Sequence, residues 1–344
     1  MTTQLDAQIG YKKQADFATA ATVDTFVEFI AEDLDHTITF AQGAGMRVGQ
    51  RIDYSDRRVK VKEEAGGSFT VELQSKGHGK LIEAALGGTG TSTQISASAA
   101  YQQLFTPTTT DTLNSYTIQK GVPPLGGGTT NAMTLEGMVC SGFELAGVNA
   151  GIPTLKFNWM GKALNTGTSL ASASYASSVT EMSFIHGSLT VGGTITVPTT
   201  TALGSSSGNA SVNIRDFSLT YDNALDPNGF NFGGSGKRSR IPALGKRKIT
   251  GSLTVEYDSN TLRDAWIAGT DLGLIITFQN TTTAIAASNY PTFQITIPVL
   301  RLDGELPKVN GGDVVTQTVP FTVLDGRSAT HPFYVAIVTA ETAI

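Results

Sequence analysis

Residues 67–75 read GSFTVELQS, and residues 251–259 read GSLTVEYDS, so Gly, Ser, Thr, Val, Glu and the final Ser occur twice at the same spacing. The distance between the two copies is far longer than the roughly 20 to 50 residues of a solenoid repeat. The sequence therefore predicts one fold present twice. A chain of 344 residues also favours two domains, which we expect at residues 1–182 and 183–344.

Two further blocks recur in the same order around this segment. Downstream, LIEAALGG at 81–88 matches LRDAWIAG at 262–269, and upstream, DHTITF at 35–40 matches DFSLTY at 216–221. Because order is preserved as well as pattern, the duplication extends over roughly half the chain.

Alternation of apolar and polar residues dominates the chain and predicts an all-β protein. In the first copy, Phe69, Val71 and Leu73 point to one side of the strand, and the residues between them point to the other. Further strands are expected at 37–40, 135–145, 154–160, 183–191, 211–221, 273–279, 293–302, 314–324 and 333–339. One short helix is expected in each half, at 79–86 and 261–268, because both segments are rich in Ala and Leu and both end at Gly.

The composition limits the classes of partner. Only 15% of the residues are charged, against about 25% in ordinary soluble domains, so the polar surface consists mainly of Thr, Ser, Asn and Gln. Such a surface suits burial against copies of the same chain. The net charge of −5 argues against bulk attraction to nucleic acid. No apolar run approaches the roughly 20 residues of a membrane span and no basic-then-apolar leader is present, so we expect a soluble, unexported protein.

Two long stretches with little periodicity, 41–65 and 223–250, are both basic. One interpretation is a solvated hairpin, and the other, favoured by recurrence in both copies, is a shared contact role. A nucleic-acid patch is less favoured because aromatic residues do not interleave with the cations. The basic residues proposed to make inter-subunit contacts are Arg51, Arg57, Arg58, Lys60, Lys237, Arg238, Lys246 and Arg247.

The residues that commonly carry chemistry form no motif in this sequence. The four histidines lie far apart, without a Cys, Asp or Glu at metal-ligand spacing, and Cys140 has no partner and no catalytic signature. We therefore expect no enzyme activity, no catalytic residue, no metal and no cofactor, and we expect Cys140 to be a buried, inert thiol.

The N-terminal run IGYKKQADFATAA at 9–21, followed by FVEF at 26–29, resembles the opening of the tail tube proteins of long-tailed, non-contractile bacteriophages. The block at 67–87, in which a Gly-Ser strand leads into a short helix ending in Leu86-Gly87, is similar to a signature of that family. The late pattern at 293–324, two strands around the turn Gly311-Gly312-Asp313, is also similar.

The resemblance implies tandem β-sandwich or barrel domains, each with one flanking helix and a long loop. It implies a structural virion protein that polymerises into stacked rings around the path of ejected DNA, which is not bound specifically. With two domains per chain, we expect three chains per ring and pseudo-six-fold symmetry. The partners implied are the chain itself and the tape measure, tail terminator and distal tail proteins, without membrane contact. Assembly in the host bacterial cytoplasm and residence in the virion tail follow from the same resemblance.

Within such a tube, strands of neighbouring domains are expected to pair edge to edge. The polar strand faces carrying Glu72, Glu256 and Asp258 are the candidates for the lumen, because like charge repels DNA phosphates. The alternative is a capsid decoration, adhesion or receptor-binding module, since Thr-rich strands and low charge suit that class as well. The N-terminal residues 1–25 are expected to form a flexible arm that becomes ordered on assembly.

Overall fold

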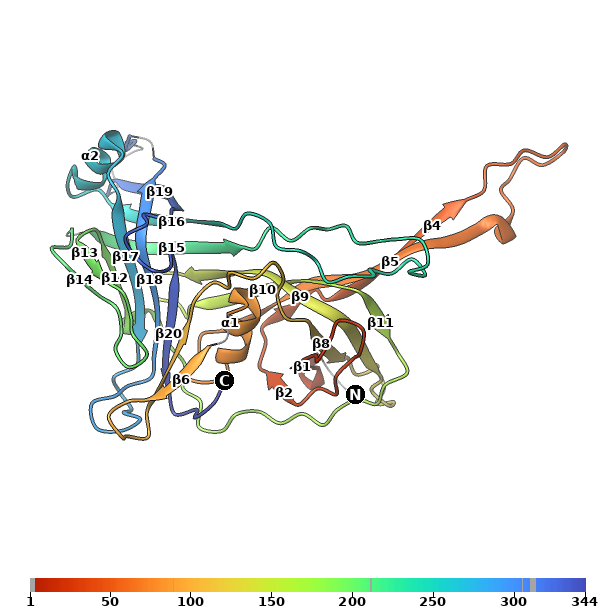
Figure 1. Cartoon of the computed structure of the whole chain (residues 1–344), viewed down its shortest axis with the longest axis horizontal. Coiled ribbons are helices and arrows are strands. Elements are labelled where there is room, and N and C mark those ends of the chain that lie inside the picture. Colours follow the sequence, from red (N-terminus) through yellow and green to blue (C-terminus); the bar gives the residue numbers. More distant parts are fainter. Residues whose placement is uncertain (1–3, 89, 211, 305, 310–313) are drawn as a thin grey trace.

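The computed structural model describes residues 4–88, 90–210, 212–304, 306–309 and 314–344 (Figure 1). The first half contains β1 (Gln8–Lys13), β2 (Thr25–Val27), β3 (Ala31–Glu32), β4 (Asp35–Gln42), β5 (Arg58–Glu72), α1 (Gly79–Leu86), β6 (Thr91–Gln94), β7 (Tyr101–Phe105), β8 (Tyr116–Gly121), β9 (Ala132–Gly147), β10 (Thr154–Gly161) and β11 (Ala163–Asn165). The second half contains β12 (Gly187–Val191), β13 (Thr194–Thr196), β14 (Ser205–Ser207), β15 (Asn213–Asp222), β16 (Lys248–Glu256), α2 (Thr261–Ala268), β17 (Leu272–Gln279), β18 (Thr292–Leu302), β19 (Thr316–Val323) and β20 (Tyr334–Thr339). Three short 3-10 helices lie at Gln4–Asp6, Ser55–Arg57 and Phe184–His186.

The all-β prediction is confirmed, and both predicted helices have the expected bounds. Strand pairing is antiparallel throughout, and one continuous path runs β4–β5–β10–β9–β15–β16–β19–β18–β17–β12. The predicted turn at Gly311-Gly312-Asp313 lies outside the described residues.

The two halves of the chain share this sheet. β9 of the first half pairs with β15 of the second, with Leu145 opposite Leu219, and β20 pairs with β7, with Ile337 opposite Gln103. Near the expected domain boundary, Met182 is buried and its N–H donates to the carbonyl of Leu73 at 2.9 Å. Strands on the two sides of the expected boundary at 182/183 are therefore joined by hydrogen bonds.

The hydrophobic core is also continuous between the halves. Phe143 stacks on Tyr221 with ring centroids 5.5 Å apart, and Tyr221 lies 5.3 Å from Phe333. Helix α1 buries most of its apolar side chains in this core, whereas α2 buries only Leu262. Both helices end at a glycine in the left-handed region, Gly87 and Gly269, a conformation that glycine adopts without a steric cost.

The glycine that opens each repeated block lets the neighbouring strand come close. A Cβ at Gly67 would lie 2.4 Å from the carbonyl oxygen of Asp33, and one at Gly251 would lie 2.3 Å from that of Ser218. Asp33 therefore occupies the same position relative to Gly67 as Ser218 does relative to Gly251.

Strand register gives the same correspondence between the copies. Asp35 pairs with Gly66 and Thr220 pairs with Thr250, so Asp35 takes the place of Thr220. The sequence alignment of Asp35 with Asp216 is therefore wrong by four residues.

The feature that extends farthest from the body of the molecule is the β4–β5 hairpin (Figure 1). The segment between β15 and β16 runs from the body toward the base of this hairpin. The stretch 41–65, for which a solvated hairpin was one interpretation, forms the outer part of this hairpin, and β5 begins at Arg58.

The expectation of a flexible arm at 1–25 is wrong for the part that forms β1. Ile9 and Tyr11 are fully buried, and β1 pairs with β8 and β2. Apolar residues at every second position, Ile9 and Tyr11, make this segment a strand of the core.

Candidate functional site

One face of the shared sheet is polar across both halves of the chain. The register places Glu72, Thr154, Ala146, Ser218, Ser252 and Pro320 side by side on β5, β10, β9, β15, β16 and β19. Hydroxyl groups bridge neighbouring strands here, with Ser218 Oγ 2.9 Å from Ser252 Oγ. The opposite side of the same strands forms the core, for example at Phe69 and Leu253. We call this surface the polar face.

Carboxylates are the prevailing charges on the polar face. Because residues opposite each other, and residues two or four apart on one strand, share a side, the face carries Glu72, Glu144, Asp216, Asp222 and Glu256. The same register places three cations there, Lys156, Lys248 and, opposite Thr322 of β19, Arg301. A duplex nucleic acid near this face would be repelled rather than held.

The tip of the β4–β5 hairpin is both apolar and basic. Met46 and Val48 are fully exposed, and Ile52 is 79% exposed. Arg47 and Arg51 lie between them and are exposed as well. Exposed apolar side chains clustered in this way mark a surface that another molecule covers.

The base of the hairpin is fixed by ion pairs to the segment between β15 and β16. Arg238 is 2% exposed, and its guanidinium pairs with Glu64 at 2.6 Å and donates to the carbonyl of Gly161 at 3.1 Å. Lys237 lies 3.5 Å from Glu63, and the N–H of Glu63 donates to the carbonyl of Gly236 at 2.9 Å. Burial disfavours ionisation of Glu63, but Lys60, Lys237 and His36 hold the pKa of its carboxyl below the ordinary value.

The ring of Phe230 adds to this clamp. It lies 4.2 Å from Lys62 Nζ and 4.7 Å from the guanidinium carbon of Arg238, within the range of cation–π attraction. The hairpin is therefore held by charge and by aromatic contact before it leaves the body of the protein.

A family model described as phage tail tube protein matches residues 4–323 of the chain. The chain belongs to the phage tail tube protein family. A comparison with curated proteins gives no match.

The structure separates the predicted basic residues of this tail tube protein into two groups. Arg51, Arg58, Lys60 and Lys246 are exposed and Arg57 is partly exposed, so their side chains are accessible to another molecule. Lys237, Arg238 and Arg247 contact other segments of the chain, and exposed Lys60 also pairs with Glu63 of its own strand at 2.5 Å.

The second group supports the hairpin and the core. Arg247 donates to the carbonyl of Thr108 at 2.7 Å and to Asn223 Oδ1 at 3.1 Å. Arg238 is buried and cannot contact another subunit. The prediction of an inter-subunit contact for Arg238 is therefore wrong. The sequence did not foresee this group because a cation that pairs internally and a cation that faces solvent look alike in a loop.

Of the three acids predicted to face the lumen of the tail tube protein, two lie on the polar face. Glu72 and Glu256 share the polar face, which also holds Glu144, a residue that the sequence reading did not single out. Asp258 lies beyond the end of β16 and accepts a hydrogen bond from Asn213 Nδ2 at 3.1 Å. Alternation within β9 would have identified Glu144.

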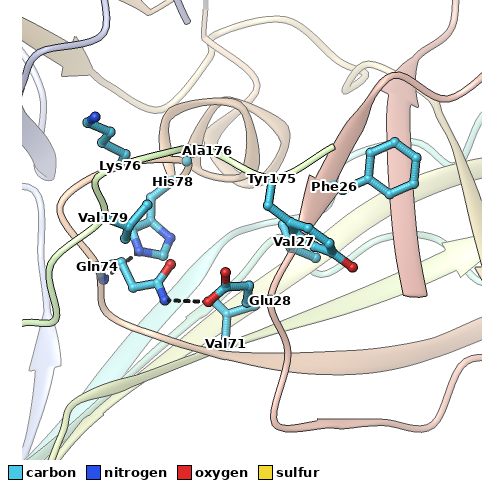
Figure 2. Close-up of a pocket in the computed structure, with 11 residues that line it drawn as sticks. Phe26, Val27, Glu28, Val71, Gln74, Lys76, His78, Tyr175, Ala176 and Val179 are labelled. Carbon is cyan, nitrogen blue, oxygen red and sulfur yellow. Dashed lines mark hydrogen bonds between the residues drawn. The ribbon is translucent and has the colours of Figure 1, made fainter. Parts of the chain in front are cut away.

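A small cavity of about 30 Å³ lies beside α1 of the tail tube protein (Figure 2). His78 borders it and is buried, and His78 Nε2 accepts a hydrogen bond from the N–H of Gln74 at 2.8 Å. Burial lowers the pKa of His78 to about 4, so the ring is neutral. Gln74 Nε2 also donates to Glu28 and Glu181, at 3.3 and 2.9 Å.

Other reactive side chains are embedded in the fold. Cys140 is fully buried, and burial raises the pKa of its thiol to about 12. Across the described ranges, no group of three or more His, Cys, Asp or Glu side chains is placed to hold a metal ion. Helices long and apolar enough to cross a membrane are likewise missing from the part of the chain that the structure describes.

Proposed function

We propose that this tail tube protein polymerises into stacked rings that form the hollow tail tube through which DNA leaves the virion. Each ring contains three chains, and the two halves of each chain give it pseudo-six-fold symmetry. Tape measure, tail terminator and distal tail proteins would contact the tube, and assembly would take place in the host bacterial cytoplasm.

The observation that carries the proposal is the continuous polar face. It passes from one half of the chain to the other through the β9–β15 pairing without interruption. A wall built of such faces is hydroxyl-rich and predominantly acidic, so it hydrates well and repels a passing phosphate backbone. We therefore assign the polar face to the lumen.

The β4–β5 hairpin is proposed to connect one ring to the next. Its base is held to the body by ion pairs, and its apolar tip is exposed. Both features suit a projection that reaches a neighbouring ring. Exposed cations along it, Arg51 and Arg58 among them, would meet acidic surface of the neighbouring ring.

The test is electron microscopy of the purified protein at high concentration, with the rotational symmetry of end-on views determined. Hollow tubes with three-fold symmetry and six lobes are expected. True six-fold rings would retain the tube function and contradict the stoichiometry, whereas discrete particles would favour the decoration or adhesion alternative.

A further inference from the structure

The junction between the two halves shows how one repeated unit joins the next. On β15, Leu219 and Tyr221 lie opposite Leu145 and Phe143 of β9, and the N–H of Asn223 donates to the carbonyl of Ser141 at 2.9 Å. In an antiparallel ladder, hydrogen-bonded pairs recur every second residue. The N–H groups of Leu219 and Tyr221 therefore point at β9.

Among the described residues, no strand lies beside the same edge in the first half. Asp33 corresponds to Ser218 by its approach to Gly67, so Leu34 corresponds to Leu219, and His36 to Tyr221. The N–H of Asp33 donates toward β5, to Ser68, which leaves the N–H groups of Leu34 and His36 pointing outward. Within the described residues, β3 and β4 pair with β5 alone.

Side chains of this chain satisfy the free edge instead. The N–H of Leu34 donates to Glu32 Oε2 at 2.8 Å, and the N–H of His36 donates to Asp35 Oδ1 at 2.7 Å. Lys120 Nζ donates to the carbonyl of Leu34 and pairs with Glu32 at 3.0 Å. The backbone N–H and the backbone carbonyl of Leu34 are thus both hydrogen-bonded to charged side chains. Charged side chains on an unpaired edge protect it from pairing with other chains at random.

A groove of about 640 Å³ runs along residues 27–32 and ends at Glu32, where this edge begins. Its walls combine apolar side chains, such as Val27, Phe29 and Val122, with Glu32 and Lys120. Ile30, which also lines the groove, is 56% exposed. Space for a chain segment therefore opens at the start of the edge, beside Glu32 and Lys120.

We infer that the outward edge at residues 32–38 is a strand-addition site for a second copy of this chain, held closed by Glu32, Asp35 and Lys120 until assembly. The occupant is argued from the chain's own β9–β15 junction, where an equivalent edge already pairs with an equivalent unit. By this correspondence, the incoming strand comes from the second half of the neighbouring copy. The inference rests on the proposed polymerisation and names the contact that closes the ring.

His36→Pro tests the edge directly. Proline removes the outward N–H and places its ring in the path of an incoming strand, while the hydrogen bonds from β4 to β5 remain, as is usual for proline on an edge strand. His36→Ala is the matched control, because it also loses the contact of His36 with Glu63 but keeps the N–H. By sedimentation, we expect the critical concentration for assembly of His36→Pro to exceed that of His36→Ala by roughly tenfold or more.

The outcomes separate the inference from the proposed function. If the wild-type chain assembles and the proline and alanine variants assemble at equal concentrations, the edge assignment is wrong and the tube function stands. If the wild-type chain stays monomeric at every concentration, both are overturned. Equal melting temperatures of the two variants establish that a difference in assembly does not arise from misfolding.

Lys120→Met tests the closing device. Methionine retains the aliphatic stem but releases the Leu34 carbonyl, so the edge opens more readily. In light scattering we expect the lag before assembly to shorten by roughly threefold or more, since a charged hydrogen bond no longer has to be broken. An unchanged or longer lag would contradict the role of Lys120.

Discussion

At the scale of single residues, His78 makes the stability of the fold depend on pH. The ring is buried at the start of α1 and accepts the N–H of Gln74, an interaction that only the neutral ring can make. Its pKa of about 4 in the folded protein lies below the ordinary histidine pKa of 6.5. The unfolded chain therefore takes up the proton first, and the stabilisation present above pH 6.5 is lost as the pH falls toward 4.

The expected size of this effect is large enough to measure. Lowering the pH from 7.5 to 4.5 should reduce the free energy of unfolding of the wild type by about 2 to 3 kcal/mol more than that of His78→Gln, whose side chain does not titrate. Urea unfolding of the two proteins at both pH values checks this. Parallel pH dependences would show that His78 ionises freely in the folded state.

At the scale of elements, the hairpin tip carries the most specific expectation. Met46, Val48 and Ile52 contribute nothing to the core, so replacing all three by Ser should leave the melting temperature within about 2 °C, since surface changes usually cost under about 0.5 kcal/mol. The variant should remain soluble yet fail to form long tubes in electron micrographs. Ile267→Ser, at a 67% exposed position on α2, is the control and should polymerise normally. Tubes of ordinary length from the triple variant would refute a stacking role for the tip.

The local sequence pattern predicted the positions of strands and helices better than it predicted which segments contact one another. Alternation identified β10, β17, β18 and β20, and the Ala- and Leu-rich runs ending at Gly identified both helices, because these signals lie within a few residues. The upstream repeat was misaligned by four residues, since an alternating Thr and apolar pattern looks the same after a shift by an even number of positions. Which cations pair internally, as Arg238 does with Glu64, depends on contacts between distant segments and could not be read from either loop.

At the scale of the whole molecule, the two halves act as one sheet, and the polar face is a property of neither half alone. The sequence predicted two domains but not the pairing of β9 with β15 or of β7 with β20, because such pairings join residues far apart along the chain. Glu72 and Glu144 in the first half and Glu256 in the second become neighbours on one surface only through this pairing.

This shared surface supports a prediction for the assembled protein. Tubes formed in the presence of short duplex DNA should exclude it when the lumen is wild type, because the carboxylates repel phosphate. Replacing Glu72, Glu144 and Glu256 by Lys should produce tubes that retain DNA protected from nuclease, and this retention should disappear at high salt as counterions compete for the phosphates. Lysines at three exposed loop positions, Asp53, Asp111 and Asp325, provide the matched control, since DNA held on the outer surface stays open to nuclease. Nuclease-sensitive DNA on the Glu-to-Lys tubes would place the polar face on the outside of the assembly.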